Sequence, residues 1–168
     1  MKNQAILHEI TAPLLYWYQG AARDLPWRRS PTPYHVWISE IMLQQTRVEA
    51  VKGYYARFLD AFPTVEALAA ADDDALNKVW QGLGYYSRAR NLKKCAKVLV
   101  EKYQGVFPCE KKELLSLPGI GPYTTGAILS IAYGQPIPAI DGNVLRVMMR
   151  VLASERDIAD EKTRRDLD

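Results

Sequence analysis

The sequence predicts an all-α fold. Apolar residues recur at spacings of three and four along most of the chain, which is the period of an amphipathic helix. The pattern covers residues 5–18, 35–45, 48–61, 72–81, 88–103, 124–133 and 143–152. No stretch alternates apolar and polar residues as a half-buried strand would. We therefore expect helices joined by loops, without a β-sheet.

Prolines and glycines separate these helical segments. In chain order they are Pro26, Pro31, Pro33, Pro63, Gly82, Gly84, Pro108, Pro136 and Pro138. Such residues interrupt helices and mark the connections between them. Residues 160–167 look like an N-cap followed by the first turns of another helix, and the chain stops there. This ending leads us to expect a fragment of a longer protein.

The composition is that of a soluble globular protein. The chain has 168 residues, of which 48% are hydrophobic and 24% charged, enough for one or two compact domains. Its apolar runs are too short to span a bilayer, and its start opens a polar-faced helix rather than a signal peptide. We expect a cytoplasmic, nucleoid-associated protein. The net charge of +3 is compatible with a polyanionic partner but too small to establish one.

The two cysteines, Cys95 and Cys109, are too far apart in sequence to form a metal-binding motif, and they provide no disulfide framework. Cys95 shares a helix face with Leu92 and Leu99. We therefore expect it to be a buried apolar side chain, and we expect no metal site in this chain.

An aromatic and basic loop, Leu25-Pro26-Trp27-Arg28-Arg29, precedes the 35–45 segment. Within that segment, Glu40 is the only ionisable side chain between His35 and Arg47. On a helix Glu40 shares a face with apolar residues, where burial would raise its pKa and let it donate a proton at neutral pH. The alternative is a glutamate at the edge of the apolar stripe whose carboxylate reaches water.

The run Gly82-Leu83-Gly84-Tyr85-Tyr86 places apolar and aromatic side chains on a glycine-flanked turn before a basic helix. Such side chains can wedge between bases, as base extrusion requires, while the basic residues neutralise phosphates. A tyrosine-packed turn followed by a solvated helix face is an equally good interpretation. The same two possibilities apply to the loop around Trp27 and Arg28.

The run Leu117-Pro118-Gly119-Ile120-Gly121 connects two helical patterns near residues 113–132 and suggests a helix-hairpin-helix. Gly119 and Gly121 allow close approach of another molecule to the main chain. Backbone amides at the start of the second helix favour an anion such as a DNA phosphate without reading sequence. Taken alone, this turn could also be an ordinary helix connection.

Asp141 precedes the last helical pattern, where its plainest role is an N-cap. If Asp141 and Glu40 met, the pair would suit cleavage of a glycosidic bond. One carboxyl group would protonate the leaving group, and the other would stabilise an oxocarbenium-like centre. The spacing of the two residues does not show that they meet.

The motifs PWRR, SEIMLQQT, GLGYYSRARNL, LPGIGPYT and DGNV occur in one order between about Leu25 and Arg150. In that order they resemble the adenine DNA glycosylases of the MutY type, in the helix-hairpin-helix superfamily that includes endonuclease III. The resemblance implies a six-helix barrel at 25–135, an N-terminal helix at 1–24 and a truncated return at 136–168, both in a second helical subdomain. It also implies a monomer that binds double-stranded DNA and removes adenine mispaired with 8-oxoguanine or guanine.

The resemblance also implies roles for individual residues. Glu40 resembles the acid that protonates the extruded adenine and later positions or activates water. Asp141 resembles the carboxylate that stabilises the sugar cation or bonds transiently to it, and Asn143 supports the site. The other matching residues are Trp27 and Arg28 in the adenine pocket, Gln45, Thr46, Leu83 and Tyr85 beside the opposing lesion, and Leu117, Gly119, Ile120 and Gly121 at the DNA backbone.

Related enzymes that also cut the strand have a lysine where this chain has Tyr123. A phenol cannot form a Schiff base, so we expect base release without efficient strand cleavage.

The resemblance further implies a [4Fe–4S] cluster held by four cysteines, and a C-terminal domain that recognises 8-oxoguanine. We expect both beyond Asp168, so the N-terminal helix would lack part of its usual packing surface and the activity of this chain is open. Two alternatives remain: a glycosylase for another mispaired base, such as thymine opposite guanine, and a non-catalytic helix-hairpin-helix DNA-binding fragment.

Overall fold

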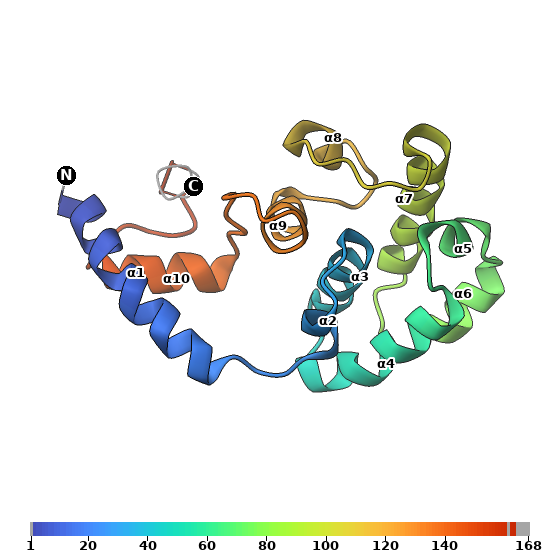
Figure 1. Cartoon of the computed structure of the whole chain (residues 1–168), viewed down its shortest axis with the longest axis horizontal. Helices are drawn as coiled ribbons and strands as arrows, with labels where there is room; N and C mark the ends of the chain where they lie inside the picture. Colours follow the sequence, from blue (N-terminus) through green and yellow to red (C-terminus); the bar gives the residue numbers. More distant parts are fainter. Residues whose placement is uncertain (1, 161, 164–168) are drawn as a thin grey trace. The chain divides into compact units, whose positions relative to one another are not determined.

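A computed structural model describes residues 2–160 and 162–163. Over these residues the regular structure is entirely helical, which confirms the all-α prediction (Figure 1). The chain divides into two compact units, one of Leu25–Ala139 and one of Met1–Asp24 with Ile140–Asp168. The boundaries that we expected at residues 24/25 and 135/136 concern functional subdomains and stay a prediction.

The larger unit is built around one central helix. Its elements are α2 (Pro26–Arg29), α3 (Pro33–Leu43), α4 (Val48–Ala61), α5 (Val65–Ala70), α6 (Asp73–Trp80), α7 (Ser87–Tyr103), α8 (Lys111–Leu115), α9 (Pro122–Ala127) and η1 (Ile128–Ala132). Helix α3 packs against α2, α4, α7, α9 and η1, and α5 packs against α7. Trp37, Phe58 and Trp80 are fully buried in the core that these helices share.

Local sequence explains where α3 begins. Pro33 occupies the first turn, where a missing N–H costs nothing, and the hydroxyl of Thr32 accepts a hydrogen bond from the His35 N–H at 3.2 Å. The helix therefore starts at a fixed point, which sets the direction in which Glu40 projects about two turns later.

Periodicity predicted the long helices better than the short ones. The expected segment 48–61 coincides with α4, and the expected segment 143–152 corresponds to α10 (Gly142–Val151). Helices α2, α5 and α8 were not among the periodic segments, because each has fewer than two turns and is too short to show a sustained apolar repeat.

The segment 124–133, expected as one regular helix, changes character halfway. It begins as α9 and continues as the π-helical turn η1. Gly126 lies before the change, where a Cβ atom would come within 2.2 Å of the Pro138 carbonyl oxygen. Only glycine fits so close to that backbone, and the wider turn that follows is a feature that helical periodicity does not reveal.

The smaller unit contains α1 (Lys2–Ala21) and α10, with Leu145 and Met149 of α10 buried. Asp160 accepts hydrogen bonds from Thr163, as an N-cap does. Residues 161 and 164–167 of the helix start expected at 160–167 lie outside the described residues. No described helix combines the length and apolar character that crossing a lipid bilayer requires.

Candidate functional site

Glu40 lies in the second half of α3 and is half-buried. Its sequence neighbours Ser39 and Ile41 are buried, and so are Val36 and Trp37 on the preceding turn. The apolar residues expected to share a helix face with Glu40 are therefore buried. Its role as a proton donor stays a prediction.

Asp141 is the N-cap of α10, as its position suggested. One carboxylate oxygen accepts from the backbone N–H groups of Asn143 at 2.9 Å and Val144 at 2.8 Å. The other accepts from Asn143 Nδ2 at 2.8 Å, and Asn143 Oδ1 in turn accepts from Arg146.

The hydrogen bonds to Asp141 favour its ionised form. Burial raises the pKa of the carboxyl group, but the bonds from Val144 and Asn143 and the charge of Arg146 lower it further, so the net shift is downward. The N-cap is thus also a fixed carboxylate anion at neutral pH, and the capping and chemical roles of Asp141 are compatible.

The loop after α3 carries Gln45 and Thr46. Gln45 has a left-handed backbone with φ of 56° and an exposed side chain. Thr46 is half-buried, and its N–H donates to the Leu43 carbonyl at 3.3 Å. The loop therefore turns sharply at the end of the central helix and presents Gln45 outward.

The two candidate wedge residues of the glycine-flanked turn between α6 and α7 differ in their exposure to solvent. Tyr85 also has a left-handed backbone, with φ of 47°, and is 61% exposed. Leu83 is only 6% exposed and packs in the core. Tyr85 is accessible in this conformation, whereas a wedge role for Leu83 would require the turn to open.

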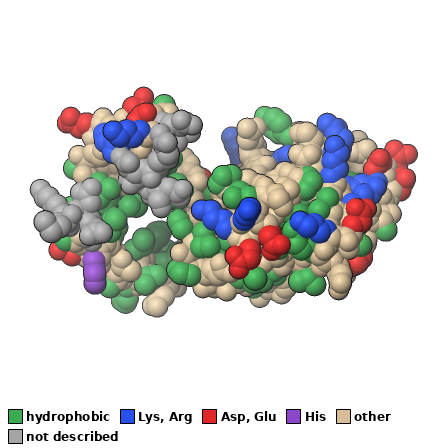
Figure 2. Space-filling model, turned by 90° about the horizontal axis from the view of Figure 1, so that it is seen from above, with side chains coloured by type: hydrophobic (Ala, Val, Ile, Leu, Met, Phe, Trp, Pro, Cys, Tyr) green, Lys and Arg blue, Asp and Glu red, His purple; other side chains and the backbone are tan. Residues whose placement is uncertain are grey.

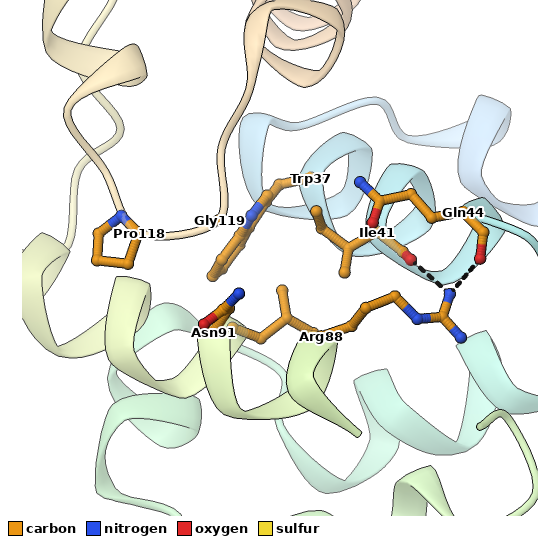
Figure 3. A pocket seen from close by; sticks show the side chains of 8 residues that line it. Trp37, Ile41, Gln44, Arg88, Asn91, Pro118 and Gly119 are labelled. Carbon is orange, nitrogen blue, oxygen red and sulfur yellow. Dashed lines mark hydrogen bonds between the residues drawn. The ribbon is translucent and has the colours of Figure 1, made fainter. Parts of the chain in front are cut away.

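Arg88 joins these two loops, and sequence reasoning missed it. Its guanidinium donates to the carbonyl oxygens of Ile41 and Gln44 at the end of α3, at 2.9 and 2.6 Å (Figure 3). It donates to the Met42 carbonyl as well, at 3.0 Å. It also donates to the Leu83 and Gly84 carbonyls at 3.0 and 3.3 Å. A sixth hydrogen bond, at 3.3 Å, reaches the Thr46 hydroxyl.

A signal for Arg88 existed in the sequence. Arg88 lies one turn before Leu92 and continues the buried stripe of Leu92, Cys95 and Leu99. A cation in an apolar stripe needs an internal partner, so the position could have been recognised as a buried, hydrogen-bonded arginine. Burial lowers the pKa of Arg88, while the nearby Tyr85 opposes that shift.

The connection between α8 and α9 is a hairpin whose turn packs on α7. Leu117 and Ile120 are buried and anchor it. Gly119 has φ of 75°, and a Cβ atom there would come within 2.8 Å of the Asn91 Cβ. Gly119 is exposed, Gly121 is half-buried, and Tyr123 in the first turn of α9 is 37% exposed. The fit against Asn91 explains why this turn requires glycine at 119.

Trp27 is buried in the larger unit, with its ring edge-on to Tyr55 at a centroid distance of 5.5 Å. The adjacent Arg28 is exposed. The first of these two candidate pocket residues is therefore part of the core packing, and the second faces solvent.

The basic face of α7 has a carboxylate neighbour. Arg90, Lys93, Lys94 and Lys97 line a groove of about 270 Å³ together with Asp73 of α6, which pairs with Lys93. On the face seen in Figure 2, basic and acidic side chains are interspersed. This arrangement fits both the phosphate-neutralising and the solvated-face interpretations of the basic helix.

The structure brings together only some of the predicted site residues. Arg88 connects Gln44 and Thr46, which flank Gln45, to Leu83 and Gly84, which precede Tyr85. Glu40 belongs to the larger unit and Asp141, with Asn143, to the smaller one. The meeting of Glu40 and Asp141 stays a prediction.

The cysteines of this chain do not fit an iron-sulfur cluster. Four thiolates are needed, and the sequence contains two cysteines. Burial raises the pKa of the Cys95 thiol to about 12, whereas Cys109 is exposed. Among the described residues, His, Cys, Asp and Glu form no group of three or more that could hold a metal ion.

Comparisons with known proteins agree on one family. A family model described as HhH-GPD superfamily base excision DNA repair protein matches residues 38–168. A protein named adenine DNA glycosylase from Buchnera aphidicola subsp. Baizongia pistaciae is 46% identical over 138 residues, which cover 82% of this chain and 39% of that protein. The protein of the same name from Homo sapiens is 46% identical over 161 residues, covering 89% and 30%. The chain thus spans well under half the length of these curated relatives.

Solved structures show the same fold. A thermostable thymine-DNA glycosylase has a TM-score of 0.83 and 30% identity, covering 88% of this chain and 69% of its own. A trapped covalent intermediate of endonuclease III with DNA has a TM-score of 0.79 and 26% identity, covering 97% and 76%.

Proposed function

The chain belongs to the HhH-GPD superfamily of base excision DNA repair proteins, and from this membership we propose that it carries the chemistry of a monofunctional adenine DNA glycosylase. The substrate is double-stranded DNA in which adenine is mispaired with 8-oxoguanine or guanine. The observation that carries the proposal is the close similarity, over most of the chain, to relatives that are named adenine DNA glycosylases.

In this proposal Glu40 and Asp141 divide the reaction. Protonation of the flipped adenine by Glu40 lets the base leave with the electron pair of its glycosidic bond. The sugar carbon then becomes cationic, and the Asp141 carboxylate stabilises it until water attacks. The hydrogen bonds from Asn143 and Val144 support this role, because they keep Asp141 ionised and fixed.

Tyr123 distinguishes base release from strand cleavage. A strand-cleaving enzyme needs an amine that forms a Schiff base with the sugar, and the phenol of Tyr123 cannot form one. The product is therefore an intact strand with an abasic site, which hot alkali breaks.

Four segments of the larger unit are assigned to contacts with DNA. Of the hairpin residues Leu117, Gly119, Ile120 and Gly121, the two glycines offer their backbone amides to a phosphate. The amides of Leu117 and Ile120 already donate to the Leu114 and Leu117 carbonyls. Gln45, Thr46 and Tyr85 face the base opposite adenine, and Leu83 joins them if its turn opens. Trp27 and Arg28 bound the adenine pocket. This assignment is supported by the exposure of Gly119, Gln45 and Tyr85.

The remaining features of the proposal concern cofactors, further domains, oligomeric state and location. A [4Fe–4S] cluster and a domain recognising 8-oxoguanine would belong to sequence outside these 168 residues. The protein would act as a monomer in the cytoplasm, associated with the nucleoid and not with a membrane.

The test is strand scission of a labelled duplex containing adenine opposite 8-oxoguanine, with the protein in excess and with or without hot alkali. Breaks that appear only after alkali support the proposal. Breaks without alkali contradict the argument from Tyr123. A complete absence of breaks contradicts the proposal for this chain.

A second candidate function is release of thymine opposite guanine, which the likeness to a thymine-DNA glycosylase favours. A panel of duplexes with adenine or thymine opposite guanine separates the two activities. A non-catalytic DNA-binding fragment would show salt-dependent binding to all of these duplexes and no base release.

A further inference from the structure

The peptide bonds that precede two left-handed residues are both held by one side chain. Gln45 and Tyr85 are the residues with φ of 56° and 47° at the tips of their loops. The carbonyls of Gln44 and Gly84 belong to the peptide bonds just before them, and both accept from Arg88. A left-handed conformation is unfavourable for side-chain-bearing residues, so it persists only where surrounding contacts fix it.

Arg88 is suited to hold both loops at once. It is 8% exposed, and its hydrogen bonds go to five carbonyl oxygens and one hydroxyl. A planar guanidinium directs its donors in a fixed fork, and its charge complements the negative end of α3. The rings of Trp80 and Tyr85 lie 5.3 and 5.5 Å from the guanidinium carbon.

The hairpin borders the same place. Arg88, Gln44 and Asn91 line a cavity of about 30 Å³ together with Pro118 and Gly119 of the hairpin turn (Figure 3). Three segments that the proposed function assigns to DNA therefore converge around one buried arginine.

We propose that Arg88 is a positioning residue that holds the Gln44–Thr46 loop and the Leu83–Tyr85 turn as one DNA-facing surface, and thereby sets the preference of the enzyme for the base opposite adenine. The second half of this inference rests on the proposed glycosylase function. The first half is a statement about the two loops and does not depend on activity.

The test compares the Arg88→Lys variant with wild type and with Arg90→Lys, a matched control at an exposed arginine on the same helix. Lysine keeps the charge but has one ammonium nitrogen with three donors in place of a planar fork, so it cannot replace all six hydrogen bonds. Hydrogen exchange followed by mass spectrometry reports amide protection in the segments 44–47 and 82–87. Single-turnover adenine release from duplexes with 8-oxoguanine or guanine opposite reports the preference.

We expect both segments to exchange faster in Arg88→Lys, together and by about tenfold or more, as loss of several charged hydrogen bonds would cause. Arg90→Lys should keep wild-type protection. The ratio of rates on the two duplexes should fall towards one, whereas partial unfolding would lower both rates and leave the ratio unchanged. Unchanged protection of either segment, or an unchanged ratio, would overturn the proposal.

If wild type releases no adenine, the proposed function fails, and hydrogen exchange alone decides whether Arg88 couples the loops. If Arg88→Lys does not fold, the decision passes to Thr46→Val, which removes one acceptor and keeps Arg88. Faster exchange at 82–87, on the other side of the guanidinium, then supports the coupling. Unchanged exchange there overturns it.

Discussion

Glu40 and Asp141 are held in place by different physical means. Glu40 lies on the central helix of the larger unit, where the side chains around it are buried. Asp141 lies at a helix start in the smaller unit, where hydrogen bonds from Asn143 and Val144 fix it. The comparison teaches that the position of the Glu40 carboxylate depends on the packing of a whole core, whereas the position of the Asp141 carboxylate depends on a local helix cap.

The largest difference should appear when one tryptophan is removed from each unit. Trp37 is 1% exposed on α3, whereas Trp17 on α1 is 62% exposed. Trp37→Ala should lower the free energy of unfolding by about 3–5 kcal/mol through cavity formation. Trp17→Ala should change it by less than about 0.5 kcal/mol. Urea unfolding measures both changes, and losses of equal size would refute the contrast between the units.

The hairpin offers a similar contrast between two glycines. Gly119→Ala requires a strained backbone and a clash with Asn91, whereas no atom lies within 4 Å of a Cβ at Gly121. We expect Gly119→Ala to cost about 1–3 kcal/mol of stability and Gly121→Ala much less. Thermal unfolding of the two variants gives the comparison, and a larger loss for Gly121→Ala would show that the turn is held differently.

At Asp141, substitution can separate capping from charge. Asp141→Ala removes the cap and should destabilise the protein by about 1 kcal/mol. Asparagine is also a good N-cap, so Asp141→Asn should retain most of that stability. Adenine release should nevertheless fall strongly in both variants, because each lacks the anion. Full activity in Asp141→Asn would show that Asp141 is only a cap.

A smaller effect concerns pH. The pKa of Asp141 is lower in the folded chain than its ordinary value of 3.8. The ionised carboxylate therefore contributes stability above that value, and the contribution is lost as pH falls through the folded-state pKa. Consequently, the difference in unfolding free energy between wild type and Asp141→Asn should shrink below about pH 3.8. A difference that grows on acidification would contradict the downward shift.

The smallest expected effect is a difference in thiol reactivity between the two cysteines, with no change in stability. Burial raises the pKa of Cys95 to about 12, so its thiol should stay protonated at neutral pH, while Cys109 is exposed. A thiol reagent used under native conditions should label Cys109 and leave Cys95 unlabelled until the larger unit unfolds. Mass spectrometry of the labelled peptides distinguishes the two sites.

The sequence predicted features that depend on short-range pattern. The helix at 48–61, the N-cap at Asp141 and the apolar neighbours of Glu40 all follow from residues within one or two helical turns. The absence of alternating apolar and polar residues also predicted that there would be no β-sheet. All regular elements among the described residues are helices.

What the sequence did not predict depends on contacts between distant segments. Arg88 meets the carbonyls of Ile41 and Met42, more than forty positions earlier in the chain, so no local pattern shows these bonds. The burial of Leu83 and the π-helical turn after Gly126 likewise result from packing against other segments. Periodicity identifies a helix, but it does not identify which buried polar group the helix must satisfy.

The central claim is that Glu40 protonates an extruded adenine. Its most direct test is chromatographic measurement of free adenine from a duplex with adenine opposite 8-oxoguanine, using wild type and Glu40→Gln side by side. We expect release by wild type, at least about a hundredfold slower release by Glu40→Gln, and unchanged duplex binding and helical content. Equal release by the two proteins would show that Glu40 is not the acid, and the account of this site would then be wrong.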